Sequence, residues 1–245
     1  IQLPDDMTSL SKSDGRKPSL ELLRGKPYDY QVSGIRWLCD YYDHGIGSIL
    51  CDEMGLGKTY QALGLIAHVL STTEQQILIC APSSLSANWI SEIEKFLQEV
   101  EIFNHFGATR ASTVRELQEK RIILTTYEIA VRDLALLDKI NWGVVICDEA
   151  QALKNRQSQR RKAIASLKSY SKVLVTGTPI ENSLKELWSL VDIVYPGLLG
   201  DYRSFESLID DNPVDAKKLG QIASPLMLRR EVLEVAKDLP PIVYI

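Results

Sequence analysis

The chain has 245 residues, of which 45% are hydrophobic and 24% are charged, with a formal net charge of −4 at pH 7. This composition is typical of a soluble globular domain, and the small negative charge excludes a globally basic nucleic-acid coat. No apolar run approaches the length that crosses a bilayer, so we expect no membrane partner.

Cysteine and histidine usage argues against a metal centre or a histidine-based nucleophile. The four cysteines (Cys39, Cys51, Cys80 and Cys147) are widely spaced without a C-x-x-C pair, and the three histidines are scattered. We therefore expect the cysteines to be small buried hydrophobic residues in a reducing compartment.

Three parts are predicted along the chain. Residues 1–19 are rich in Ser, Asp, Lys and Pro without periodicity, which indicates a flexible tail or linker. Residues 20–195 form the main domain, and residues 196–245 are expected to be a small helical appendage followed by an exit linker. Because the chain begins at Ile1 rather than Met, we expect it to be a fragment of a longer protein.

Apolar strand-like runs alternate with helical patterns through the main domain. Strands are expected at Ser48–Cys51, Ile77–Ala81, Glu101–His105, Ile122–Thr125, Val144–Cys147 and Lys172–Thr176. Helices are expected at Thr59–Leu70, Ser86–Leu97, Ala111–Lys120, Gln157–Leu167 and Ser183–Val194, with Asp201–Ile209 and Leu226–Val235 in the appendage.

This alternation predicts an α/β fold, in which helices cover both faces of a parallel sheet to give three αβα layers. In such sheets ligands bind at the carboxyl ends of the strands. Polar loops marked by glycine or proline fall at these ends: Asp52–Thr59, Ala81–Ser83, Thr125–Tyr127, Asp148–Gln151 and Thr176–Pro179. We expect these loops to form one functional edge.

The stretch Asp52-Glu53-Met54-Gly55-Leu56-Gly57-Lys58-Thr59 predicts a phosphate-binding loop between a strand and a helix. Backbone N–H groups at a helix start favour phosphate, a lysine ammonium reaches the outer phosphates, and a threonine hydroxyl can hold Mg²⁺. Asp52 departs from the strict pattern, which has glycine there. The alternative is a tight strand-to-helix turn with a solvated Lys58.

A second acidic motif, Asp148-Glu149-Ala150-Gln151, ends a later apolar run. One carboxylate can hold the metal and the other can polarise an attacking water, so the two motifs together predict an ATP-driven machine.

Three basic clusters could contact nucleic acid or form solvated helix faces. They are Lys154-Asn155-Arg156, Arg160-Arg161-Lys162 and Arg229-Arg230.

These ordered motifs, from about Leu23 to Pro241, resemble the first RecA-like lobe of the Swi/Snf-type DNA translocases in helicase superfamily 2. Asp52–Thr59 is similar to the family form D-E-x-G-L-G-K-T. Three segments look most like those of bacterial members: Asp148–Gln151, Thr176–Asn182 and Pro196–Gly200. The resemblance implies a RecA-like fold and ATP-driven movement on double-stranded DNA without strand separation.

The resemblance implies the roles of the nucleotide-site residues. Lys58, Asp148 and Glu149 are implied to be catalytic, and Thr59 with Asp148 to hold Mg²⁺. Gln31 is implied to hydrogen-bond the adenine edge, and the alternative is an exposed glutamine that begins a helix. The implied ATP-binding residues are Gln31, Asp52, Met54, Gly55, Leu56, Gly57, Lys58, Thr59 and Tyr60.

Further motifs imply contacts with DNA and coupling of hydrolysis to movement. The loop with Ser83 and Ser84 and the loop with Thr125, Thr126 and Tyr127 resemble segments that lie along a nucleic-acid backbone. The two serines could instead be plain helix N-caps. The implied coupling residues are Gln151, Thr176, Gly177 and Thr178, and Gln151 departs from the commoner histidine.

In the family a second RecA-like lobe supplies arginines that complete the active site, and residues 228–230 and 239–241 resemble the bridge into it. This chain alone is therefore expected to bind nucleotide weakly and to hydrolyse it poorly. Partner domains are expected to decide which DNA-bound protein or polymerase is moved. The location is expected to be cytoplasmic and nucleoid-associated in a bacterium, or nuclear in a eukaryote.

Two alternatives of function remain open from the sequence. One is an enzyme that separates DNA or RNA strands. The other is a non-catalytic nucleotide-binding module with a vestigial site, although the intact Lys58, Thr59, Asp148 and Glu149 speak against it.

Overall fold

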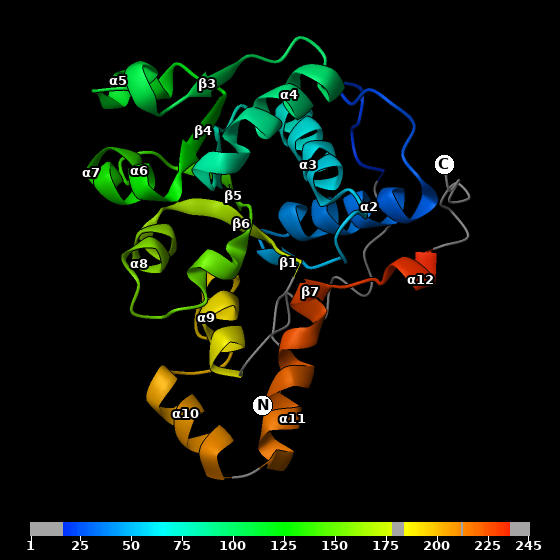
Figure 1. Cartoon of the computed structure of the whole chain (residues 1–245), viewed down its shortest axis with the longest axis vertical. Coiled ribbons are helices and arrows are strands. Elements are labelled where there is room, and N and C mark those ends of the chain that lie inside the picture. Colours follow the sequence, from blue (N-terminus) through cyan, green and yellow to red (C-terminus); the bar gives the residue numbers. More distant parts are fainter. Residues whose placement is uncertain (1–16, 178–183, 212, 236–245) are drawn as a thin grey trace.

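A seven-stranded sheet forms the centre of the molecule, with the strand order β3-β4-β2-β5-β6-β1-β7 (Figure 1). The structure is a computed structural model and describes residues 17–177, 184–211 and 213–235. All neighbouring strands pair in parallel, which confirms the predicted α/β fold. The strands are β1 Ser48–Leu50, β2 Ile77–Ala81, β3 Ile102–Asn104, β4 Ile122–Thr126, β5 Trp142–Cys147, β6 Ser169–Val175 and β7 Met227–Leu228.

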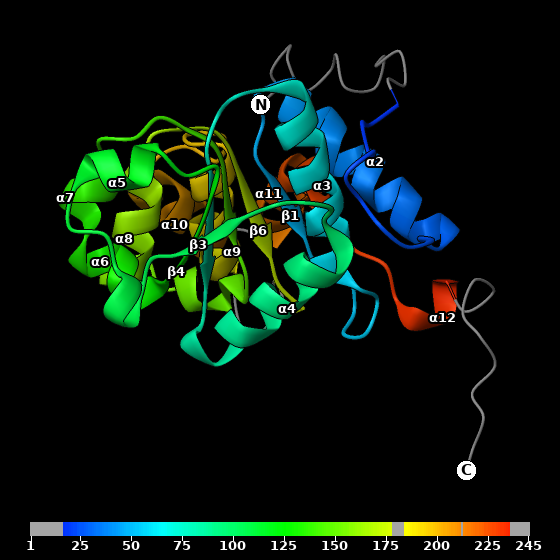
Figure 2. The same cartoon turned by 90° about the horizontal axis from the view of Figure 1, so that it is seen from above.

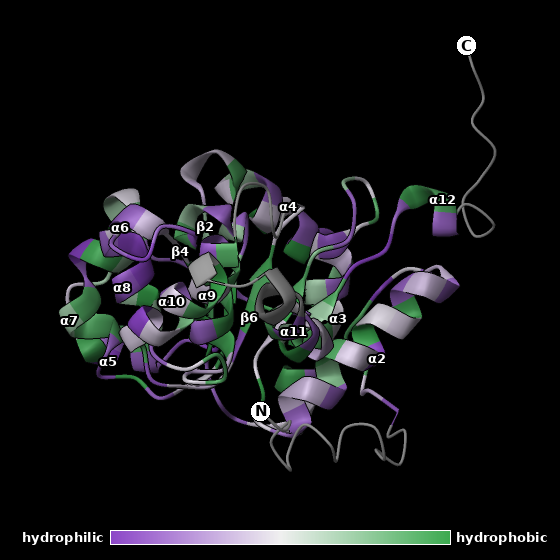
Figure 3. Cartoon of the chain, turned by 90° about the horizontal axis from the view of Figure 1, so that it is seen from below, coloured by the Kyte–Doolittle hydropathy of each residue, from purple (hydrophilic) through white to green (hydrophobic). Residues whose placement is uncertain are grey.

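The central strands contribute to two separate hydrophobic cores, one on each face of the sheet. In β2, Ile77 and Ile79 belong to one buried cluster, whereas Leu78 and Cys80 belong to the other. This division follows from the strand geometry, because successive side chains point to opposite faces. Burial on both faces explains why these strands read as continuous apolar runs. Hydrophobic residues accordingly gather on the central strands in Figure 3.

One face of the sheet is covered by three consecutive α-helices, α2, α3 and α4 (Figure 2). His68 joins two of them, because its Nε2 lies 2.9 Å from Asp43 Oδ1, and its Nδ1 accepts a hydrogen bond from the Ser19 N–H. These helices are α2 Asp29–Asp43, α3 Lys58–Thr72 and α4 Ser86–Phe96, the last of which follows the 3₁₀ turn η1 Ser83–Leu85.

The opposite core is covered by helices from the second half of the domain (Figure 2). Two short helices here, at residues 127–132 and 134–137, were not expected from the sequence, because neither is long enough to show a helical period. The helices are α5 Val114–Gln118, α6 Tyr127–Arg132, α7 Leu134–Leu137, α8 Gln159–Ser166 and α9 Leu184–Val194, with 3₁₀ turns η2 Gly107–Thr109 and η3 Ala150–Leu153.

The C-terminal part leaves the sheet and then returns to it (Figure 1). Helices α10 Tyr202–Asp211 and α11 Pro213–Ala223 extend from the body, and η4 Ser224–Leu226 leads back into β7.

The predicted helix at Leu226–Val235 is therefore wrong in its first part. Met227 and Leu228 pair in parallel with Ile49 and Leu50 of β1, and only α12 Val232–Val235 is helical. A two-residue strand is too short to show alternation, and it is stabilised because it covers the backbone edge of β1. The expected appendage thus ends by joining the main sheet.

Within the described ranges, none of the helices combines the length and apolar character that crossing a bilayer requires.

Candidate functional site

The predicted phosphate-binding loop connects β1 to α3. Its two glycines have φ angles of +89° at Gly55 and +68° at Gly57, in the left-handed region that glycine adopts without steric cost. Gly57 directly precedes α3, so the free N–H groups of the first helical turn face the loop. The strand, glycine turn and helix therefore follow one another as the sequence predicts.

Lys58 is held at the base of this loop by the loop's own backbone. Its Nζ donates to the Asp52 carbonyl at 2.9 Å and to the Glu53 carbonyl at 3.3 Å. An ammonium has a further donor beyond these two, so Lys58 can bind a phosphate oxygen while it remains in place. The alternative of a solvated lysine on a simple turn does not fit these contacts.

A cavity of about 490 Å³ lies between the loop and the acidic motif. It is lined from a third side by α4, through residues that include Asn88, Trp89 and Glu92. The loops after β1 and β5 thus meet around one space, as expected at the carboxyl edge of a parallel sheet. Among the residues proposed from sequence, the lining contains Met54, Gly55, Gly57, Lys58, Thr59, Tyr60, Asp148 and Glu149.

Asp148 is fixed by hydrogen bonds at each of its polar atoms. Trp89 Nε1 donates to its Oδ2 at 2.8 Å, and the Glu149 N–H donates to its Oδ1 at 2.9 Å. The Tyr127 hydroxyl donates to its carbonyl at 2.6 Å. Each carboxylate oxygen still has a free lone pair, so the group is oriented without losing its capacity to bind a cation.

The charge of Asp148 depends on its surroundings. Burial raises the pKa of its carboxyl above the ordinary value, while the hydrogen bonds from Trp89 and Glu149 and the charge of Lys58 lower that pKa. A buried carboxylate is stabilised by a nearby positive charge, so these surroundings favour a bound cation.

Glu149 has an unusual backbone conformation, with φ 49° and ψ 50° in the left-handed region. Side chains other than glycine rarely adopt this conformation, and such strain often occurs at functional sites. Gln151 Nε2 donates to Glu149 Oε2, and Gln151 Oε1 accepts from the Thr176 hydroxyl at 2.9 Å. A continuous polar chain therefore joins the ends of β5 and β6.

Gly177 brings the same β6 loop against the phosphate-binding loop. A side-chain carbon at this position would lie 3.4 Å from Met54 Cγ and 3.8 Å from Lys58 Nζ. Three of the predicted coupling residues, Gln151, Thr176 and Gly177, thus contact or border the nucleotide motifs. The fourth, Thr178, lies outside the described residues, as do residues 179–182 of the same motif.

Gln31 packs directly against the phosphate-binding loop, since a side-chain carbon at Gly57 would lie 2.5 Å from its Nε2. Its Oε1 accepts a hydrogen bond from the Tyr28 N–H at 3.0 Å. The side chain is buried, so the alternative of an exposed glutamine beginning a helix is wrong. A second hollow, of about 290 Å³, is lined by residues 26–29 just before it.

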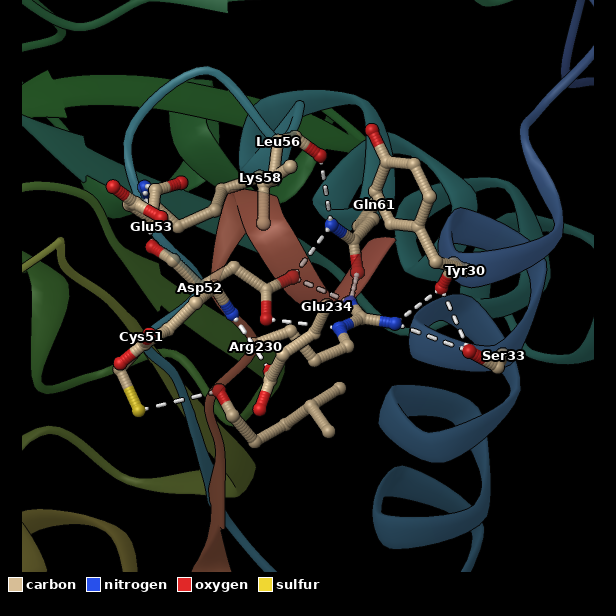
Figure 4. A network of polar contacts seen from close by, with 12 residues as sticks. Tyr30, Ser33, Cys51, Asp52, Glu53, Leu56, Lys58, Gln61, Arg230 and Glu234 are labelled. Carbon is tan, nitrogen blue, oxygen red and sulfur yellow. Dashed lines mark hydrogen bonds and ion pairs between the residues drawn. The ribbon is translucent and has the colours of Figure 1, made fainter. Parts of the chain in front are cut away.

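Two residues expected to bind ATP instead support the loop from below. The Asp52 carboxylate is fully buried and bound to Arg230 and Gln61, away from the cavity lining (Figure 4). Leu56 is buried in a small cluster with Tyr30. These positions correct the sequence prediction for both side chains, because the Asp52 carboxylate is paired with Arg230 and the Leu56 side chain is packed in a hydrophobic cluster. Tyr60 lines the cavity, but its hydroxyl donates to the Arg24 carbonyl at 3.0 Å.

Mg²⁺ fits this site if phosphate and water complete its coordination. In the part of the chain that the structure describes, no group of three or more His, Cys, Asp or Glu side chains could hold a metal ion. Mg²⁺ commonly binds through one or two protein oxygens together with substrate phosphates. Thr59 and Asp148, which line the same cavity as Lys58, offer this type of partial site.

A family model describes nearly the whole chain. The match to the SNF2-related domain covers residues 30–244. The chain belongs to the SNF2-related domain family. This result confirms the Swi/Snf-type family that the motifs predicted.

Individual relatives agree with the family assignment. The chain is 33% identical over 237 residues to the chromatin-remodeling ATPase INO80 of Kluyveromyces lactis, covering 86% of this chain and 16% of that protein. It is 34% identical to INO80 of Saccharomyces cerevisiae, with the same coverage. These relatives come from yeasts, so the expected similarity to bacterial members finds no support in them.

Solved structures share the fold. The SWI2/SNF2 ATPase core of Sulfolobus solfataricus in complex with double-stranded DNA has a TM-score of 0.83 and 33% identity, covering 89% of this chain and 48% of that one. The SWI2/SNF2 ATPase core domain of the same organism also has a TM-score of 0.83, at 32% identity, covering 94% of this chain and 48% of that one. The SNF2-related domain described here thus spans about half of these solved chains and about 16% of the INO80 proteins.

In this SNF2-related domain the predicted loop at residues 125–127, which we call the β4 loop, is the direct junction of β4 with α6, and it does not present the expected DNA contacts. Thr125 is fully buried, and its hydroxyl donates to the His105 carbonyl at 3.1 Å. Thr126 caps α6 by accepting from the Ile129 N–H at 3.3 Å. Tyr127 is 2% exposed and bound to the Asp148 carbonyl. The prediction that these three side chains contact DNA is wrong, because internal backbone groups use them.

Ser83 and Ser84 differ from the β4 residues, because both side chains are exposed. Neither η1 nor α4 has a side-chain cap hydrogen bond, so the alternative that these serines act as N-caps is not supported.

The basic clusters are largely engaged within the domain. Lys154 lies 3.2 Å from Glu186, and Arg156 stacks on the Tyr202 ring at 4.1 Å. The basic side chains were expected either to contact nucleic acid or to form solvated helix faces. Neither expectation describes side chains that are paired within the domain. The further pairs are Arg160 with Glu128, Arg161 with Asp192, and Arg230 with Asp52.

The sequence analysis did not predict the roles of two side chains: Trp89, which orients Asp148, and Arg230, which binds Asp52. A signal existed in each case. A tryptophan on a buried helical face needs a partner for its N–H. A carboxylate that directly follows a buried strand needs a counter-charge.

Proposed function

We propose that this chain is the ATP-binding lobe of a DNA-dependent ATPase that moves along double-stranded DNA and remodels protein–DNA complexes. One observation carries the proposal: the loop with Lys58 and Thr59 and the acidic pair Asp148 and Glu149 line the same cavity of about 490 Å³. The names of the relatives, chromatin-remodeling ATPases and an ATPase core in complex with DNA, support it.

The chemical roles follow from the types of side chain around the cavity. Lys58 binds the β- and γ-phosphates, and Thr59 with Asp148 would hold Mg²⁺, which when bound neutralises phosphate charge. Glu149 orients the attacking water and accepts its proton. Gln31 recognises the adenine edge through its amide, next to the hollow lined by residues 26–29.

Coupling to movement is assigned to the polar chain beside the site. The bonds from Glu149 through Gln151 to Thr176 connect the proposed water-binding carboxylate with the β6 loop. Gly177 and Thr178 belong to the same proposed coupling segment. A change at the γ-phosphate would thereby alter the loop after β6.

The complete motor requires parts beyond this chain. A second RecA-like lobe of the same polypeptide would supply arginines to the phosphates, a contribution of about 10³–10⁵ in rate in related phosphoryl transfer. DNA would bind through its backbone, with the exposed Ser83 and Ser84 as contacts. We propose a nuclear location, since the reported INO80 relatives are from yeasts, and a load that is a DNA-bound protein or polymerase.

The decisive experiment measures ATP hydrolysis by the full-length protein with double-stranded DNA, single-stranded DNA and RNA in parallel. We expect stimulation by double-stranded DNA, and loss of both nucleotide binding and turnover in Lys58→Ala. Strand displacement from matched duplexes would instead indicate a helicase. Absence of nucleotide-dependent thermal stabilisation of the wild-type protein would indicate a vestigial site.

A further inference from the structure

Asp52 occupies the position where the common phosphate-binding loop has glycine, and its carboxylate has no exposed surface. The guanidinium of Arg230 binds both of its oxygens: Nε lies 3.0 Å from Oδ1, and Nη2 donates to Oδ2. Gln61 Nε2 also donates to Oδ2 at 3.0 Å. The fork of donors in arginine matches a carboxylate in this bidentate geometry.

Arg230 also reaches the helix that carries Gln31 (Figure 4). Its Nη1 donates to the Tyr30 carbonyl and to the Ser33 hydroxyl at 3.1 Å, and its guanidinium lies 5.4 Å from the centre of the Tyr30 ring. Its Nη2 donates to Gln61 Oε1 at 2.7 Å. One side chain therefore joins α2, the start of the loop and α3.

The backbone around Arg230 lies alongside the first half of the loop. The Cys51 N–H donates to the Leu228 carbonyl at 2.8 Å, and the Glu53 N–H donates to the Arg230 carbonyl at 2.9 Å. The Val232 N–H donates to Glu53 Oε2 at 2.6 Å. Residues 228–232, which we call the return segment, thus lie along the first half of the proposed nucleotide loop.

These contacts continue to Lys58. The Asp52 carbonyl accepts from Lys58 Nζ, and Gln61 Nε2 also donates to the Leu56 carbonyl at 3.3 Å. The residues that bind Arg230 therefore also hold the beginning and the middle of the loop. Without Arg230, Asp52 would be a buried charge lacking its cationic partner, which disfavours this arrangement.

We propose that Arg230 is a positioning residue for the nucleotide site, and that docking of the return segment and binding of nucleotide favour one another. Arg230 acts through Asp52 and Gln61, which hold the loop in the form that presents Lys58. Coupling of this kind is reciprocal, so nucleotide binding stabilises the return segment as much as the docked segment stabilises binding. The inference rests on the proposed ATP binding.

Nucleotide affinity of the full-length protein without DNA tests the first half. The variants are Arg230→Gln, Asp52→Asn and their combination, with Arg229→Gln as the matched control. The Arg229 side chain is 62% exposed and lies 3.9 Å from Glu231. We expect each single variant to weaken ADP and ATP binding about tenfold, within the range of about 5–150-fold typical of coupled sites. The combined variant should bind nucleotide no more weakly than the single variant with the lower affinity, because both substitutions break the same Arg230–Asp52 pair.

Hydrogen exchange of the return segment tests the second half. In the wild-type protein we expect ADP to slow exchange in peptides covering residues 227–235, and in Arg230→Gln we expect this protection to disappear. Arg230→Lys keeps the charge without the fork, so its affinity should lie between those of the other two proteins. If Arg230→Gln does not fold, Asp52→Asn and Arg230→Lys give the same comparison.

A purely structural role would lower the melting temperature of these variants while leaving nucleotide affinity and ADP-dependent protection as in the wild type. That result would overturn the inference while leaving the proposed function intact. Failure of the wild-type protein itself to bind nucleotide would overturn the proposed function.

Discussion

The loops after β1 and β5 and the β4 loop at residues 125–127 lie at the same edge of the sheet, yet their polar residues have different roles. Around the cavity, Lys58, Thr59 and Glu149 line open space. At the end of β4 and the start of α6, Thr125 and Tyr127 are buried and bind backbone carbonyls.

The comparison shows that a polar residue at a strand end has two possible uses. It can face a ligand, or it can satisfy a buried backbone group that would otherwise lose its hydrogen bond. Tyr127 satisfies a buried backbone group, because its hydroxyl donates to the carbonyl of Asp148. It thereby helps to hold a residue whose side chain faces the cavity. The β4 loop thus supports the proposed nucleotide site through the backbone of Asp148.

The largest effect is expected at the carboxylate that faces the cavity. Glu149→Gln removes the proposed base while keeping its size, so turnover with double-stranded DNA should fall by about 10²–10⁴-fold. Affinity for ATP should persist, as measured by equilibrium titration. Glu94→Gln, at an exposed position on α4, is the control. Normal ATP hydrolysis by Glu149→Gln would mean that Glu149 is not the base.

A smaller effect is expected behind the cavity, at Trp89. Trp89→Phe keeps the buried ring but removes the hydrogen bond to Asp148 Oδ2, so turnover should fall by about 10–100-fold, as is typical when a ligand's supporting bond is lost. The loss should grow at low Mg²⁺ concentration, which is measured by titrating the metal.

Trp142→Phe is the matched control for that experiment, because Trp142 is equally buried and donates to the Leu137 carbonyl. It should lower stability without changing the Mg²⁺ dependence. An identical Mg²⁺ dependence in both variants would mean that Trp89 is a packing residue only.

The β4 loop should affect stability rather than DNA binding. Tyr127→Phe leaves the Asp148 carbonyl without its partner, which should lower the free energy of unfolding by about 1–2 kcal/mol. Denaturant unfolding measures this loss of stability. The DNA affinity of the folded protein, measured by DNA titration, should stay unchanged. A loss of DNA affinity at unchanged stability would restore the original DNA-contact hypothesis.

The smallest effect is expected at the exposed serines. Combined Ser83→Ala and Ser84→Ala should weaken binding of double-stranded DNA by about 0.5–1.5 kcal/mol in total, the value of one lost hydrogen bond, without lowering the free energy of unfolding. Ser71→Ala, at an exposed position near the C-terminal end of α3, is the control. Equal DNA affinity in all three proteins would exclude the β2 loop as a backbone contact.

The sequence by itself determined the alternation of strands and helices, the order of the motifs and the loop that carries Lys58. These features follow from local periodicity and from residues a few positions apart, so one segment contains the whole signal. The sequence also predicted that Asp148 and Glu149 would meet this loop, because parallel strands end at one edge.

Only the tertiary structure decided which partner each polar residue takes. Arg230 binds Asp52 across 178 positions of the chain, and Trp89 binds Asp148 across 59. The same holds for β7, whose two residues form a strand only because β1 offers an open edge. Such choices depend on which distant groups are buried together, and no local period records that.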